Sequence, residues 1–173
     1  MRIYLIGFMG CGKTTLGKEL ALLLNYTFID LDELIEESQN MPVKEIFSIK
    51  GEDKFRILEK ECLHQTVTKN DIVIATGGGA PCFFDNMDFI NLHGSSVYLK
   101  VDPVDLRNRL ADNSENIQSQ NERPLIKNKN PEQLLSYIQD TLIEREQFYR
   151  RAKLIVDGTT ITASKLKDLI IHH

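Results

Sequence analysis

The chain has 173 residues, of which 42% are hydrophobic and 27% charged, and its formal net charge is −4. This composition argues against a disordered chain, a collagen-like repeat or a coiled coil, and the length fits one domain that buries about 70% of its unfolded surface. The acidic balance, without a basic run, argues against nucleic-acid binding, and no apolar stretch reaches the ~18–20 residues that a membrane span needs. Three cysteines do not make a disulfide framework, so we expect a reducing, cytoplasmic environment.

Short apolar segments alternate with helical patterns along the chain. The predicted strands cover residues 2–6, 27–29, 71–75, 96–101 and 154–156, and the predicted helices cover residues 13–24, 32–39, 43–49, 52–69, 103–111, 131–151 and 163–171. Several strands are apolar at nearly every position, which is typical of strands buried on both faces of a parallel sheet. The alternation predicts an α/β fold with right-handed crossovers, in which ligands bind beyond the carboxyl ends of the strands.

Residues 112–130 depart from this alternation. The segment is rich in Asn, Gln, Ser and Glu and contains Arg123 and Pro124. Connections longer than about 12–15 residues in compact domains are usually functional lids or disordered insertions. We therefore expect a long mobile loop here, with Arg123 as an arginine that closes over a transferring phosphoryl group.

A phosphate-binding motif follows the first predicted strand. Residues 7–14, GFMGCGKT, match the pattern G-x-x-x-x-G-K-[ST] between a strand that ends at Ile6 and a helix that begins at Lys13. The glycines let backbone N–H groups surround an anion, and the helix N-terminus adds partial positive charge. The lysine can reach the β- and γ-phosphates, and the Thr14 hydroxyl can bind Mg²⁺. The motif predicts nucleotide binding without fixing the reaction, because P-loop folds serve kinases, GTPases and ATPases alike.

Two carboxylates follow the second predicted strand. Side chains two positions apart in an extended segment point the same way, so Asp30 and Asp32 can face one cleft. One can support a Mg²⁺ shell while the other orients or deprotonates an attacking hydroxyl. In the alternative interpretation, Asp32 only caps a helix that begins at Glu33, and Asp30 is a solvated loop residue.

A triple glycine, Gly77, Gly78 and Gly79, follows the third predicted strand. Consecutive glycines cost backbone entropy on folding. They indicate either a backbone that closely approaches a ligand or a plain turn.

Several arginines occur at positions that indicate an anionic ligand. Arg145 falls within the apolar stripe of the helix predicted over 131–151, where an unpaired charge is costly. Arg56 lies three residues before Glu59, a spacing that places both on one helix face. Two arginines in one cleft suit a planar carboxylate, which a guanidinium binds bidentately, although each can instead form an ordinary surface ion pair. Arg109 can neutralise a phosphate or stack on a base.

Together these segments resemble the shikimate kinase family of nucleoside-monophosphate-kinase-like P-loop proteins. The matching segments are GFMGCGKTT (7–15), DLDELIE (30–36), FRILE (55–59), ATGGGA (75–80), ERPL (122–125) and EREQFYRRA (144–152). The resemblance implies a five-stranded parallel sheet with helices on both faces, one kinase domain over 1–173, a substrate-binding region at about 31–60 and a mobile lid at about 112–125. It also implies a monomer that uses ATP and Mg²⁺ to phosphorylate the 3-hydroxyl of shikimate, on the route to chorismate and the aromatic amino acids.

The resemblance further implies a role for each matching residue. The ATP-binding residues would be Gly10, Cys11, Gly12, Lys13, Thr14 and Thr15, with Arg109 beside the adenine and Arg123 over the phosphates. The shikimate-binding residues would be Asp32 at the hydroxyl, Arg56 and Arg145 at the carboxylate, and Gly77, Gly78 and Gly79 along the ring, with Glu59 orienting Arg56 and with apolar walls from Val43, Phe47, Phe55, Pro124 and Leu125. Thr14, and Asp30 through water, would hold the metal, and Lys13, Asp32 and Arg123 would be catalytic.

Two other classes of protein share part of this pattern. A kinase for gluconate or a nucleoside monophosphate shares the phosphate loop and lid but does not require two arginines with a triple glycine. A non-catalytic nucleotide-binding module or GTPase-like switch is the second, but the segment 128–131, NKNP, lacks the aspartate of a guanine-binding N-K-x-D motif. Residues 157–160 also lack the arginine that the shikimate kinase family often carries near the adenine.

Overall fold

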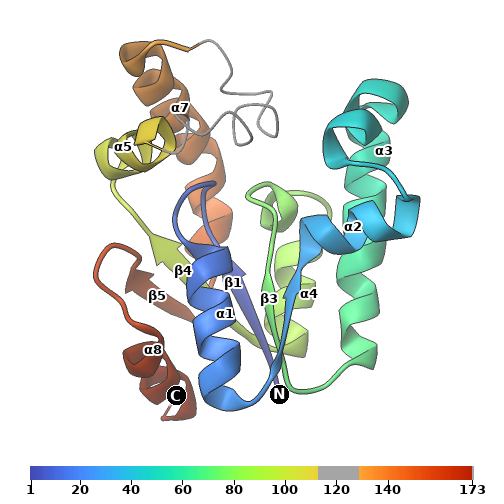
Figure 1. The fold of residues 1–173 in the computed structure, drawn as a ribbon, viewed down its shortest axis with the longest axis vertical. Helices are drawn as coiled ribbons and strands as arrows, with labels where there is room; N and C mark the ends of the chain where they lie inside the picture. Colours follow the sequence, from blue (N-terminus) through green and yellow to red (C-terminus); the bar gives the residue numbers. More distant parts are fainter. Residues whose placement is uncertain (113–128, 173) are drawn as a thin grey trace.

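The computed structural model describes residues 1–112 and 129–172. Within them, five parallel strands form one sheet in the order β2-β3-β1-β4-β5 (Figure 1). The strands are β1 (Arg2–Ile6), β2 (Thr27–Asp30), β3 (Ile72–Ala75), β4 (Ser95–Lys100) and β5 (Leu154–Asp157). Each lies within one residue of its predicted bounds, and the predicted parallel α/β fold is confirmed.

Helices cover both faces of the sheet (Figure 1). They are α1 (Lys13–Leu24), α2 (Leu31–Gln39), α3 (Val43–Gln65), α4 (Asn86–His93), α5 (Pro103–Asp112), α7 (Pro131–Tyr149) and α8 (Ala163–Ile171), with short 3₁₀ turns η1 (Thr66–Thr68) and η2 (Ala80–Cys82). Of the helices in 1–112 and 129–172, none is long and apolar enough to cross a bilayer.

Alternate residues of β1 pack into two separate cores. Ile3 and Leu5 join apolar side chains of α1, α5, α7 and α8 on one face. Tyr4 and Ile6 join those of α2, α3 and α4 on the other. All four side chains are fully buried, which explains why this strand is apolar at nearly every position. The central strand is thereby fixed on both faces, and its carboxyl end is a rigid support for the loop that follows.

Helices α3 and α4 show where the helices follow the sequence predictions and where they differ from them. The predicted break between the helices over 43–49 and 52–69 is confirmed, because α3 is kinked at Gly51, whose φ of 79° suits a residue without a Cβ. This element ends at Gln65, because the next three residues form the turn η1. Helix α4 was not predicted: only Met87 and Ile90 are apolar and buried in its eight residues, too few to produce a clear helical period.

The start of α2 also differs from both interpretations of the two aspartates. Asp30 ends β2 and caps α2, since its Oδ1 accepts the backbone N–H of Asp32 at 3.1 Å. The helix begins at Leu31, so Asp32 lies in its first turn. The predicted extended geometry is therefore wrong, and so is the alternative in which Asp32 is the cap. An acidic residue in the first helical turn is itself favourable, because the helix dipole is positive there.

Candidate active site

The phosphate loop connects β1 to α1 at the carboxyl end of the sheet. Gly7, Gly10 and Gly12 have φ angles of 143°, 79° and 101°, which residues with a Cβ rarely adopt. Lys13 is only 9% exposed, and its Nζ donates to the carbonyl oxygens of Gly7 and Phe8 at 2.8 and 2.9 Å. The loop therefore holds a buried ammonium group against its own backbone, at the N-terminus of α1.

The Cys11 side chain packs the phosphate loop against the core. Its side chain belongs to the core on the α1 face, and its Sγ lies 3.6 Å from Nζ of Lys13. Its backbone N–H donates to the carbonyl of Phe8 at 3.2 Å.

Thr14 and Asp30 place two oxygen-bearing side chains beside the loop. The Thr14 hydroxyl donates to Asp30 Oδ2 at 3.1 Å, and Thr14 is exposed. Mg²⁺ prefers oxygen ligands and usually takes only one or two from the protein, together with phosphates and water. The chemistry of this pair fits the ion that the sequence implies.

Gly77 lies against two carboxylates. A Cβ atom on Gly77 would lie 2.9 Å from Glu59 Oε1 and 3.0 Å from Asp32 Oδ1. Burial raises the pKa of Asp32 to about 6, and the neighbouring Asp30 charge adds to the rise. Burial also raises the pKa of Glu59 to about 7, although Arg56 opposes this rise. At pH values above about 6, Asp32 is ionised and able to accept a proton from a hydroxyl.

Arg56, on α3, is a nearly fully buried cation. It is 8% exposed, and its Nη1 donates to Glu59 Oε2 at 2.8 Å. Its Nη2 and Nε donate to Glu52 Oε1 at 3.1 and 3.3 Å. A Cβ on Gly79 would lie only 2.7–2.9 Å from Cζ, Nη1 and Nη2, so the guanidinium occupies space that a glycine leaves. The contact between Glu59 and Arg56 was predicted from the sequence. The contact with Glu52 was not predicted, although Glu52 precedes Arg56 by four residues on the same helix, a spacing that brings side chains together.

Arg145 approaches the triple glycine from α7. A Cβ on Gly78 would lie 3.4 Å from Arg145 Nη1 and 3.5 Å from both Gly7 O and Met9 N of the phosphate loop. The Tyr149 hydroxyl donates to the Gly78 carbonyl and its ring is fully buried, so α7 also anchors this glycine. This contact was not predicted from the sequence, because nothing in a helical pattern indicates that the Tyr149 hydroxyl has a backbone partner.

Arg109, on α5, contacts the phosphate loop. Its Nη1 and Nη2 lie 3.3 Å from Cys11 O and 3.4 Å from Gly158 O. Gly158 belongs to the turn after β5, in which Asp157 Oδ1 accepts the N–H of Thr159 at 2.8 Å. The guanidinium thus connects the phosphate loop to the segment in which the sequence expected the adenine contacts.

The predicted site residues in the described part of the chain gather at the carboxyl end of the sheet. Of the predicted apolar walls, Phe47 and Phe55 pack with ring centroids 4.3 Å apart, and both lie beside Arg56. Arg123, Pro124, Leu125 and nearly all of the predicted lid lie outside the described residues.

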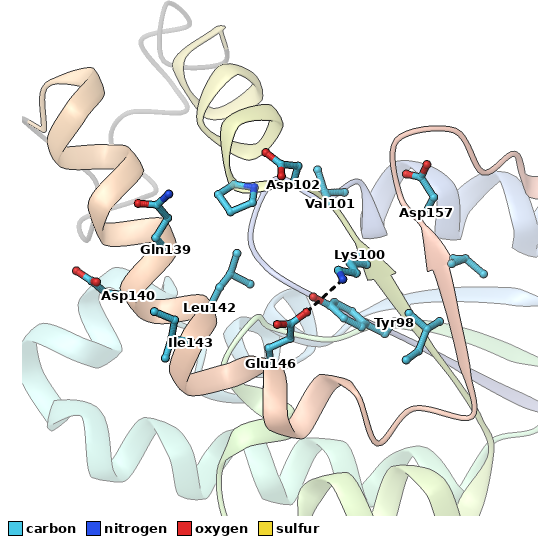
Figure 2. Close-up of a pocket in the computed structure, with 13 residues that line it drawn as sticks. Tyr98, Lys100, Val101, Asp102, Gln139, Asp140, Leu142, Ile143, Glu146 and Asp157 are labelled. Atoms are coloured by element: carbon cyan, nitrogen blue, oxygen red, sulfur yellow. Dashed lines mark ion pairs between the residues drawn. The ribbon is translucent and has the colours of Figure 1, made fainter.

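A separate open groove of about 800 Å³ lies between α7 and the ends of β4 and β5 (Figure 2). Lys100 and Glu146 form an ion pair across it at 3.7 Å (Figure 2). None of the predicted site residues that the structure describes lines this groove. Neighbouring residues of α7 therefore belong to different regions: Arg145 lies beside Gly78, and Glu146 lines the groove.

Comparison with known proteins gives one consistent result. A sequence model of the shikimate kinase family matches residues 9–172. A shikimate kinase of Bacteroides fragilis is 47% identical over 168 residues, which cover 97% of this chain and 88% of that protein. The crystal structure of a shikimate kinase from Bacteroides thetaiotaomicron is 40% identical, with a TM-score of 0.91 over 99% of this chain and 98% of that chain. That of a shikimate kinase from Acinetobacter baumannii in complex with shikimate is 36% identical, with a TM-score of 0.81 over 99% of this chain and 90% of that chain.

Proposed function

The chain belongs to the shikimate kinase family and is an ATP-dependent kinase of shikimate, and we propose that the residues around its triple glycine transfer the γ-phosphoryl group to the 3-hydroxyl. The observation that carries this proposal is the position of Gly77, Gly78 and Gly79. Their missing side chains leave room for Asp32, Glu59, Arg56 and Arg145, and Gly78 also lies against the phosphate loop. One short segment therefore connects an anion-binding pair of arginines and a carboxylate to the nucleotide loop.

On the acceptor side, Arg56 and Arg145 bind the carboxylate of shikimate. Guanidinium groups suit this ligand because their N–H donors match a planar carboxylate. Asp32 orients the hydroxyl and accepts its proton as the phosphoryl group is transferred. Its raised pKa of about 6 suits this role, because a general base works best when its pKa lies near the working pH.

On the nucleotide side, the amides of the phosphate loop and Lys13 bind the phosphates. Phosphoryl transfer depends mainly on positioning and on neutralisation of charge. Lys13 supplies one cation, and Arg123, by the resemblance, supplies another. Mg²⁺, when bound, neutralises the phosphate oxygens, and Thr14 with Asp30 would hold it.

Several further properties belong to the same proposal. The chain over 1–173 forms one kinase domain, with a substrate-binding region at about 31–60 and a lid at about 112–125. This region contains Asp32, Arg56 and Glu59, whose contacts support it. We also expect a cytoplasmic monomer whose partners are ATP and shikimate rather than nucleic acid or a membrane.

The acceptor distinguishes this function from that of a gluconate or nucleoside-monophosphate kinase. We would measure ADP release from Mg-ATP by the purified protein with shikimate, gluconate, AMP or no acceptor, and identify the product by mass spectrometry and NMR. We expect ADP release that requires shikimate, with phosphate on the 3-hydroxyl, and no turnover by the Lys13→Ala variant. Turnover with another acceptor alone would refute the acceptor assignment, and ATP binding without any turnover would favour a non-catalytic module.

A further inference from the structure

An aromatic ring that none of the roles above uses lies against Arg56. The centroid of the Phe83 ring is 4.1 Å from Cζ of Arg56, compared with 5.2 Å for Phe55 and 5.9 Å for Phe47. A cation within about 6 Å of a ring centroid is attracted by the ring quadrupole. Phe83 therefore makes the closest of these three ring contacts with the guanidinium, and it comes from a different part of the chain than α3.

A ring contact restrains an arginine differently from an ion pair. A guanidinium has five N–H donors, and within the described residues three of them donate to Glu52 and Glu59. The Arg56 Cζ lies over the Phe83 ring, 4.1 Å from its centroid, and this contact with the ring face needs no oxygen acceptor. Two N–H donors therefore remain, one on each Nη. Phe83 thus restrains the guanidinium and leaves one donor on each Nη for a planar carboxylate.

The turn that presents Phe83 is fixed by its neighbours. Asn86 is fully buried, and its Nδ2 donates to the carbonyl of Ala80 at 2.8 Å, while its backbone N–H donates to Phe83 O at 3.3 Å. Phe84 has a φ of 53°, which a bulky side chain rarely adopts and which persists only when the surroundings enforce it. This strained turn places Phe83 beside Arg56 and leaves Phe84 57% exposed.

We propose that Phe83 is a positioning residue for acceptor binding, because its ring holds the Arg56 guanidinium in the orientation that binds the shikimate carboxylate. The inference rests on the proposed role of Arg56 and adds to it a residue outside the segments that resemble the family.

The test removes the Phe83 ring and compares the effect with that of removing the neighbouring Phe84 ring. Phe83→Leu should raise the KM for shikimate by roughly 3- to 30-fold, the range of a cation–π contact from partly to fully desolvated, with kcat and the KM for ATP changed less than about twofold. Phe83→Tyr keeps the ring and should restore the KM. The matched control is Phe84→Leu: that ring lies over Lys60 Nζ at 5.3 Å, outside the site, and its loss should leave all three constants unchanged. Circular dichroism checks that each variant is folded.

A double-mutant cycle shows whether Phe83 acts through Arg56. In an Arg56→Ala background, Phe83→Leu should cause no further rise in the KM for shikimate. An unchanged KM in Phe83→Leu alone, an equal rise in both backgrounds, or no rescue by Phe83→Tyr would overturn the inference and leave the proposed function standing. If Arg56→Ala itself leaves the KM for shikimate unchanged, the proposed role of Arg56 fails, and the role of Phe83 fails with it.

Discussion

The acceptor side and the nucleotide side of the site differ in what they are made of. On the acceptor side, the buried side chains of Arg56 and Glu59 pair at 2.8 Å, and contacts come from α2, α3, α7 and the segment after β3. On the nucleotide side, one continuous segment from Gly7 to Thr14 supplies mostly backbone groups, and Thr14 itself is exposed. With the proposed assignment of the two sides, specificity for the acceptor depends on tertiary packing, whereas phosphate binding depends on the local conformation of one loop.

The largest effect that separates the two sides is expected at Asp32. Asp32→Asn keeps the size of the side chain but removes the carboxylate that we propose accepts the hydroxyl proton. We expect kcat to fall by at least roughly 10²-fold, the usual range for loss of a general base, while the affinity for ATP measured by calorimetry stays unchanged. Near-normal turnover would remove Asp32 from the reaction. Glu33→Gln, an exposed neighbour on α2, serves as the control.

The same substitution should stabilise the protein in a pH-dependent way. The pKa of Asp32 is raised from 3.8 to about 6 by burial, so the folded state keeps the proton that the unfolded state loses between these pH values. Wild-type protein therefore loses stability as the pH rises from about 4 to about 6, whereas Asn does not titrate. The advantage of Asp32→Asn in the free energy of unfolding should grow from near zero at pH 4 to as much as about 3 kcal/mol at pH 8. Urea denaturation across this range measures it, and a difference independent of pH would contradict the proposed burial cost.

Arg145 tests whether the acceptor side acts separately from the nucleotide side. Arg145→Ala removes the charge-assisted hydrogen bonds that we propose Arg145 makes to the shikimate carboxylate, so the KM for shikimate should rise by about 10- to 100-fold. The KM for ATP should change much less. Arg150→Ala is the matched control on the same segment, because Arg150 is exposed and pairs with Glu146 at 3.1 Å. A change confined to the KM for ATP would refute the carboxylate assignment.

The smallest of these effects is expected at two neighbouring glycines, Gly78 and Gly79. A Cβ on Gly79 would lie 2.7–2.9 Å from the Arg56 guanidinium, whereas a Cβ on Gly78 would lie no closer than 3.4 Å to its neighbours. Gly79→Ala must displace a buried, paired arginine, so we expect the KM for shikimate to rise by about tenfold, the loss of one good hydrogen bond. Gly78→Ala should have a smaller effect. Steady-state kinetics of both variants compare the two increases in KM. An equal or larger increase for Gly78→Ala would contradict the close packing of Arg56 on Gly79.

The nucleotide side could be predicted from the sequence because its signal is local. The pattern over residues 7–14 specifies a strand, a glycine turn and a helix, and the structure has all three where expected. Alternating apolar runs also indicated all five strands. The residue pair Arg56 and Glu59 was predictable for the same reason, since both lie on one helix.

The acceptor side was only partly predictable because its contacts join distant parts of the chain. Tyr149 reaches Gly78 across 71 positions, and nothing in a helical stripe indicates that its hydroxyl has a backbone partner. Phe83 follows the triple glycine in a turn whose strained Phe84 has no sequence signal. The start of α2 at Leu31 was mispredicted because Asp30 and Asp32 both fit the role of a cap, and only the backbone geometry distinguishes them.

We infer that the acceptor side is assembled by the protein's own ion pairs and recognises a carboxylate. Isothermal titration of shikimate and of its methyl ester into the nucleotide-free protein tests this inference, because the ester lacks the negative charge and adds only a methyl group. We predict that shikimate binds and that the ester binds at least about tenfold more weakly. In the Arg145→Ala variant, the ratio of the two affinities should be smaller. Equal affinity for the acid and the ester would show that the site does not recognise the carboxylate.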